Sequence, residues 1–149
     1  MIAKIQTYFD APAEDAWELL KKRDTFLYIT WGFLGFAGNK AWPERFFPGQ
    51  EIHTRLIFFH ILPTWRHVLR VVRMEDRLME LYSNEQGGFI RTWNHLIKIE
   101  HESDGRCRYM DRIEIDAGWM TLGVWLYAHV FYQYRQYRWK RLIRRMTDF

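Results

Sequence analysis

The chain has 149 residues, of which 48% are hydrophobic and 18% aromatic, and its formal net charge is +4. With four Pro and nine Gly, this composition excludes a disordered or fibrous chain and favours one globular domain spanning residues 1–149. A lone cysteine, Cys107, excludes a disulfide framework and a multi-cysteine zinc site.

The N-terminal third of the chain predicts a strand and two short helices. Residues 2–9 are predicted as the strand. A helix is expected to begin near Pro12, because proline suits the first helical turn and the acids after it favour the helix dipole. Residues 24–36 are apolar and aromatic and predict a second short helix. Residues 41–50 hold two prolines and predict a loop.

The middle of the chain predicts a meander of five strands. Between them lie breaks such as Gln86-Gly87-Gly88 and Ser103-Asp104-Gly105, each as short as a hairpin loop. Successive strands should therefore be antiparallel neighbours. The predicted strands are residues 51–62, 64–73, 77–85, 89–101 and 106–116.

The last part of the chain predicts a helix of up to about 30 residues that starts near Trp119. Residues 117–134 lack charged side chains, and this length is at the edge of a membrane span. Because the stretch includes His129 and Gln133, we expect a helix packed on the rest of the domain instead. The first residues lack the apolar core of a signal peptide, so a cytoplasmic location is expected.

Positive charge is concentrated at the C-terminus. The last 15 residues hold six bases and one acid, whereas the rest of the chain holds 16 bases and 17 acids. Tyrosine and tryptophan lie between these bases, which would suit an anionic membrane surface or an RNA backbone. We favour a helix with a solvated basic face and expect no nucleic-acid partner. A weak membrane contact would use Arg138, Arg141, Arg144 and Arg145.

Alternation along the last two predicted strands identifies their buried face. Side chains of a strand alternate between the two faces of a sheet, and in both strands the odd positions are the more apolar. A turn at residues 103–105 keeps odd positions opposite odd positions. It places His95 directly opposite Asp111 or one diagonal step away, which is within side-chain reach.

The same inward face carries an unexpected set of polar residues. Because buried charges are costly unless they are paired, these side chains should form a network or line a wet cavity. One interpretation is an ion-pair cluster that stabilises the sheet. The other is a polar patch at the bottom of an apolar pocket, where it would orient a ligand. The residues are His67, Glu85, Arg91, His95 and Asp111.

If the protein is an enzyme, His95 with Asp111 is the best general acid–base pair. A carboxylate that holds one imidazole nitrogen leaves the other free to move a proton. Glu85 or Tyr109 could act as a second proton donor or acceptor, and Arg91 could hold an enolate or a carboxylate.

Other kinds of catalytic site are weakly supported. The chain has two serines, Ser83 and Ser103, and Cys107 is expected in the core. His53, His60 and His67 recur every seven residues, but odd separations on a strand fall on opposite faces. We therefore expect no metal site and no cofactor.

Several local motifs, together with the element order, resemble the START-like superfamily, also called SRPBCC. Its members share the helix-grip fold of the birch pollen allergen. The entry into the first helix, Ala11-Pro12-Ala13-Glu14-Asp15-Ala16-Trp17, is similar to that of the family. Asn84-Glu85-Gln86, followed by Trp93-Asn94-His95 and then Asp111, resembles a pattern in its bacterial ligand-binding or polyketide cyclase/dehydrase-like branches.

The resemblance implies an α+β fold in which a curved antiparallel sheet wraps around a long C-terminal helix, with two short helices after the first strand. It also implies a cavity between sheet and helix that binds a lipid, a polyketide or a similar apolar molecule. Trp119, Trp125, Tyr132 and Trp139 of the last helix depart from the usual pattern and could crowd this cavity.

The expected function is therefore binding of a hydrophobic or aromatic small molecule. Trp65, Trp93, Tyr109 and Trp125 would supply apolar contact. A first alternative is a cyclase or dehydratase that uses His95 and Asp111, and a second is a module that contacts a membrane surface or RNA through the basic end. Polar orientation of the ligand would come from His67, Glu85, Arg91, His95 and Asp111.

Overall fold

The computed structural model describes residues 1–147. Its main element is a seven-stranded antiparallel sheet with the order β1-β7-β6-β5-β4-β3-β2. The strands are β1 (Ile2–Phe9), β2 (Leu34–Phe36), β3 (Glu51–Phe58), β4 (Leu62–Glu75), β5 (Glu80–Gly87), β6 (Ile90–His101) and β7 (Cys107–Asp116). The helices are α1 (Ala13–Leu20), α2 (Arg23–Thr30), η1 (Asn39–Ala41), η2 (Gly118–Met120) and α3 (Thr121–Thr147).

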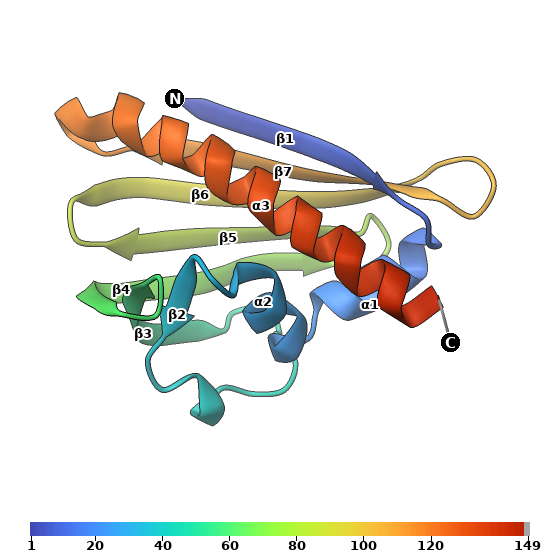
Figure 1. Cartoon of the computed structure of the whole chain (residues 1–149), viewed down its shortest axis with the longest axis horizontal. Helices are drawn as coiled ribbons and strands as arrows, with labels where there is room; N and C mark the ends of the chain where they lie inside the picture. Colours follow the sequence, from blue (N-terminus) through green and yellow to red (C-terminus); the bar gives the residue numbers. More distant parts are fainter. Residues whose placement is uncertain (148–149) are drawn as a thin grey trace.

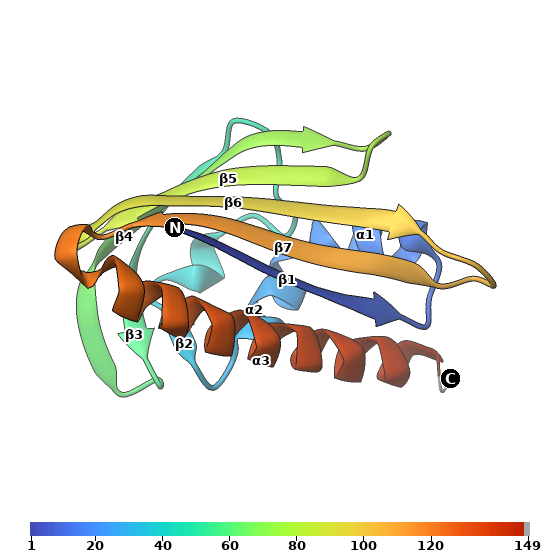
Figure 2. The ribbon, with the colours of Figure 1, turned by 90° about the horizontal axis from the view of Figure 1, so that it is seen from above.

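The sheet is curled, and the 27-residue helix α3 runs diagonally across its inner face (Figure 1). Viewed from above, β6, β7 and β1 form one side of the curl, and β3 and β2 bend round towards α3 (Figure 2). This arrangement is the helix-grip fold. It confirms the predicted fold class, including the two short helices after the first strand.

Two local predictions are wrong. The helix predicted over residues 24–36 ends at Thr30, and Leu34–Phe36 forms the edge strand β2. Gly32 separates the two elements with a φ of 99°, which suits glycine and is incompatible with a continuing helix. The strand expected to reach residue 62 ends at Phe58, because Phe59 and His60 adopt left-handed φ angles and turn the chain into β4.

The C-terminal half of α3 packs solidly against the sheet. The side chain of Trp139 is fully buried, and its ring lies 5.4 Å from both Phe9 of β1 and Tyr109 of β7, measured between centroids. Cys107 lies in the same cluster, where burial raises the pKa of its thiol to about 11. This end of the molecule is therefore a close-packed core with Cys107 as an inert member.

The strand register agrees with the predicted alternation. Odd positions are buried from Trp93 to Ile99 in β6 and from Cys107 to Ile115 in β7. Within this pair, His95 is opposite Ile113, and Ile97 is opposite Asp111. His95 and Asp111 are therefore diagonal neighbours on the inner face, one of the two placements that the turn allowed.

Candidate ligand-binding cavity

A cavity of about 720 Å³ lies between the curled sheet, α2 and the N-terminal half of α3. Its volume falls within the range of about 300–1,000 Å³ that is usual for small-molecule sites. Its walls are mainly aromatic and aliphatic. The lining side chains include Phe26, Leu34, Phe36, Leu56, Phe58, Trp65, Trp93, Val124, Tyr127 and Phe131.

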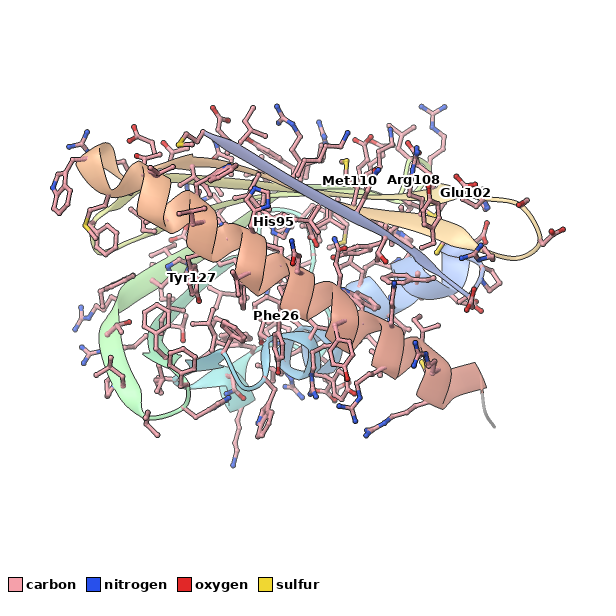
Figure 3. All side chains as sticks on the ribbon, turned by 45° about the horizontal axis from the view of Figure 1, so that its top comes forward. Phe26, His95, Glu102, Arg108, Met110 and Tyr127 are labelled. Carbon is pink, nitrogen blue, oxygen red and sulfur yellow. The ribbon has the colours of Figure 1, made fainter. Side chains whose placement is uncertain are left out.

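The aromatic wall depends on a glycine pair in the β5–β6 turn. The ring of Trp65 packs over Gly88, where an added Cβ would lie 2.5 Å from Cδ2 of the indole. Gly88 also has a φ of 55°, and an added Cβ on Gly87 would lie 2.7 Å from the indole. Only glycine leaves room for Trp65 at this wall. Phe26 of α2 and Tyr127 of α3 also line the cavity. In Figure 3 both lie beside α3, on its flank that faces the curled strands.

One end of the cavity opens to solvent near the start of α3. Trp119 and Leu122 line the cavity and are also 93% and 58% exposed. Phe89, in the β5–β6 turn, lines the cavity and is 42% exposed. We call these three side chains the mouth of the cavity.

A first polar pair, His67 and Glu85, lines the cavity from β4 and β5. Nε2 of His67 lies 2.8 Å from Oε2 of Glu85. Burial would raise the pKa of Glu85, but the hydrogen bond with His67 and nearby positive charges, including that of Arg135, together outweigh burial and lower the pKa. Nδ1 of His67 and Nε1 of Trp65 are buried and have no hydrogen-bond partner among the residues that the structure describes. Buried polar atoms without a hydrogen-bond partner are rare in a closed core.

A second polar pair, His95 and Asp111, lies behind the cavity wall. Nε2 of His95 is 2.7 Å from Oδ1 of Asp111, which also accepts a hydrogen bond from the Tyr109 hydroxyl at 3.2 Å. Gln136 of α3 donates to Oδ2 at 3.1 Å. Burial would raise the pKa of the Asp111 carboxyl, but the hydrogen bonds from His95 and Gln136 and the charge of Arg135 together lower it. Asp111 is therefore a buried carboxylate whose two oxygens are both engaged.

His95 does not line the main cavity. It borders a small adjoining hollow of about 40 Å³, shared with Glu85 and Arg135, and in Figure 3 it lies between the sheet and α3. Its Nδ1 is 3.4 Å from the hydroxyl of Tyr132, and Tyr132 does line the cavity. The hydrogen-bonded connection from the His95–Asp111 pair to the cavity wall therefore runs through Tyr132.

Arg135 is the main site residue that the sequence interpretation missed. It projects from α3, lines both hollows and is only 3% exposed. In the sequence it belongs to the basic end of the chain. Its helical spacing from Ala128, Phe131 and Trp139, which are all buried, is the signal that could have placed it inside.

The sequence-predicted site residues divide into two groups. Trp65, His67, Glu85 and Trp93 line the cavity. Tyr109 is fully buried in the core, where its hydroxyl bonds to Asp111, so it does not reach the cavity.

Arg91 and Trp125 also lie away from the cavity, so their predicted inward positions are wrong. Arg91 is exposed at the start of β6, with its guanidinium beside Gly118. A register shift between Glu85 and Gly87 disturbs the alternation at that end of the strand. Nε1 of Trp125 donates to the Ile2 carbonyl at 2.8 Å, because this side of α3 faces β1.

Part of the basic end of α3 packs against α2. Nε of Arg138 donates to the Tyr28 carbonyl at 3.0 Å, and its guanidinium lies 4.0 Å from the centre of the Tyr28 ring. Arg145 also lies over this ring, and Arg141 lies over Tyr137. Asp148, the acid of this segment, is outside the described residues.

Neither a metal centre nor a membrane span is found within residues 1–147. No group of three or more His, Cys, Asp or Glu side chains in this range is arranged to hold a metal ion. In the same range, no helix combines the length and the apolar character that crossing a membrane requires.

Comparison with known proteins identifies the fold. No protein-family model matches the sequence, and neither does any curated protein. A protein of Chromobacterium violaceum has a similar structure, with a TM-score of 0.73 at 11% identity over 95% of this chain and 96% of that one. A START superfamily protein of Mycobacterium smegmatis has a TM-score of 0.68 at 12% identity, over 97% and 98% of the two chains.

Norcoclaurine synthase of Thalictrum flavum, solved with dopamine and hydroxybenzaldehyde, is similar over 77% of this chain and 68% of its own, with a TM-score of 0.56 at 11% identity. Together these likenesses show that the chain has the START-like helix-grip fold. At this level of identity they establish the fold alone.

Proposed function

We propose that this protein is a single START-like domain that binds an apolar or aromatic small molecule in the cavity between the sheet and α3. The observation that carries the proposal is the cavity of about 720 Å³ with mainly aromatic and aliphatic walls. Protein interiors are normally close-packed, and unfilled volume lowers stability. A hollow of this size beside a well-packed core is best explained by a ligand that fills it.

The lining residues suggest how such a ligand would bind. Phe26, Trp65, Trp93 and Tyr127 would contact its apolar body, and the open mouth at Trp119 would admit it. The unpartnered Nδ1 of His67 would face a polar group of the ligand. In support, norcoclaurine synthase, with the same fold, was solved with two aromatic molecules bound.

Two measurements test this proposal. Native mass spectrometry of protein purified gently from the organism that encodes it should reveal an extra mass that is lost on denaturation. Titration with N-phenyl-1-naphthylamine, a neutral apolar dye that fluoresces when shielded from water, should give saturable binding with a stoichiometry near one. An apo mass together with no saturable dye binding would contradict a ligand-binding cavity.

Acid–base catalysis is a second candidate function, favoured by the contacts from Asp111 through His95 to Tyr132 at the cavity wall. Its test uses the compound released from the purified protein. After incubation, the compound should change mass with the wild-type protein, for example by the loss of water, and remain unchanged with His95→Gln. Equal conversion by the two proteins would exclude this role for His95.

A further inference from the structure

Arg135 indicates the chemical class of the ligand. We propose that the cavity binds an elongated apolar acid and that Arg135 holds its carboxylate, an inference that rests on the ligand-binding function proposed above. The guanidinium of Arg135 is buried at the cavity wall, and the residues that the structure describes supply no acceptor for it.

The partners of Arg135 are aromatic rings. Its guanidinium carbon lies 4.8 Å from the centre of the Tyr132 ring and 5.9 Å from that of Phe131. Within residues 1–147, Arg135 makes no hydrogen bond or ion pair, and its Nε is buried without a partner. A guanidinium has five N–H donors and cannot accept, so each donor requires an oxygen from elsewhere. Most buried charges are paired, which makes this one exceptional.

The nearby carboxylates keep Arg135 charged without binding it directly. Burial would lower the pKa of Arg135, but the surrounding acidic groups, Asp111 first and Glu85 among them, together outweigh burial and raise the pKa. Asp111 is engaged by His95, Tyr109 and Gln136, and Glu85 by His67. The donors of Arg135 therefore remain available for a planar acceptor such as a carboxylate, which the guanidinium fork matches in geometry.

The position of Arg135 defines the orientation of the ligand. Arg135 lies 13 residues beyond Leu122 of the mouth, which corresponds to about 20 Å along the axis of α3. Between these two positions, Val124, Tyr127 and Phe131 line the cavity on α3. A bound acid would place its carboxylate at the inner end and its apolar body along this wall, towards the mouth.

A matched pair of probes tests the inference. Dodecanoate and 1-dodecanol share an apolar chain and differ in the head group. Each would displace bound N-phenyl-1-naphthylamine at about pH 8, where a carboxylic acid is ionised. We expect dodecanoate to displace the dye at a concentration about tenfold or more lower than dodecanol, as charge-assisted hydrogen bonds imply.

Variants then assign the preference to Arg135. Arg135→Met should still bind the dye and should lose the preference for the acid, and Arg135→Lys should keep part of it because the charge remains. Arg141→Met is the matched control: Arg141 lies on the same helix but is exposed, so the preference should be unchanged. Circular dichroism establishes that each variant is folded.

The possible outcomes separate the two proposals. Equal displacement by the acid and the alcohol in the wild-type protein would overturn the acidic ligand but leave the apolar cavity intact. A preference that persists in folded Arg135→Met would overturn the role of Arg135. Absence of dye binding in the wild-type protein, together with an apo mass, would contradict the ligand-binding function itself. If Arg135→Met does not fold, the comparison of dodecanoate with dodecanol in the wild-type protein still tests the acidic ligand. Arg135→Lys then tests the role of Arg135.

Discussion

His95 and Asp111 meet as diagonal neighbours across β6 and β7, with Nε2 of the imidazole 2.7 Å from Oδ1 of the carboxylate. The other carboxylate oxygen accepts a hydrogen bond from Gln136 of α3, and Gln136 also donates to the Ile5 carbonyl of β1 at 2.9 Å. A single buried carboxylate thus joins the sheet to the helix. It lies between the core around Trp139 and the part of α3 that borders the cavity.

Replacing Asp111 should strongly destabilise the fold. Asp111→Ala leaves His95, Tyr109 and Gln136 without their common acceptor, so we expect the free energy of unfolding to fall by about 3 kcal/mol. Urea denaturation followed by circular dichroism would measure the change. Glu114→Ala, at an exposed position of the same strand, is the control and should cost less than about 0.5 kcal/mol. Similar small losses in both variants would show that this network contributes little.

The stability of the protein should fall in acid, because the carboxylates of the two polar pairs, Glu85 and Asp111, have lowered pKa values. The pKa of Asp111 lies below its ordinary 3.8, and that of Glu85 below its ordinary 4.5. A carboxyl whose pKa is lower in the folded state stabilises that state above its unfolded pKa. This stabilisation is lost as the pH falls through the folded value.

The corresponding measurement is the free energy of unfolding as the pH is lowered from above 4.5 to about 3. It should decrease in the wild-type protein. In Asp111→Asn the decrease below 3.8 should be shallower, because one titrating group is gone. If the free energy of unfolding falls as steeply with pH in this variant as in the wild-type protein, Asp111 does not contribute to the acid sensitivity as predicted.

Gly123 offers a way to change the cavity without disturbing the core. It lies in α3, lines the cavity, and an added Cβ would meet no atom within 4 Å. Gly123→Ala should stabilise the protein by about 0.5–1 kcal/mol, since alanine has the higher helix propensity, and should leave dye binding intact. Gly123→Phe should place a ring in the cavity and weaken dye binding. If the two variants bind equally well, the dye binds elsewhere.

Two tryptophans near opposite ends of α3 should respond differently to truncation. Trp139→Ala removes a fully buried ring and should cost about 3–5 kcal/mol, a large share of the stability of a small domain. Trp119→Ala, at a position 93% exposed, should change stability by less than about 0.5 kcal/mol and yet weaken dye binding at the mouth. Thermal unfolding and dye titration of both variants check this pair. A large loss of stability in Trp119→Ala would contradict its assignment to the mouth.

Much of this architecture was predictable from local patterns. The strand predicted over residues 2–9 has the same bounds as β1, and the short turns correctly imply antiparallel neighbours. From the sequence alone, the alternation of β6 and β7 places His95 within a diagonal step of Asp111, as the structure has it. These inferences succeed because strand alternation and hairpin pairing are properties of a few consecutive residues.

Whether an inward side chain faces core or cavity depends on contacts between distant segments. Tyr109 and Trp93 share an inward parity, yet Trp139 covers Tyr109 whereas Trp93 borders the hollow. The rotation of α3 about its axis sends Trp125 to β1 and brings Arg135, counted as part of a basic end, under the sheet. The sequence by itself determined the antiparallel meander, the inward face of β6 and β7 and the long last helix. The tertiary structure decided where packing stops and the cavity begins, because the docking of α3 depends on all of its long-range contacts at once.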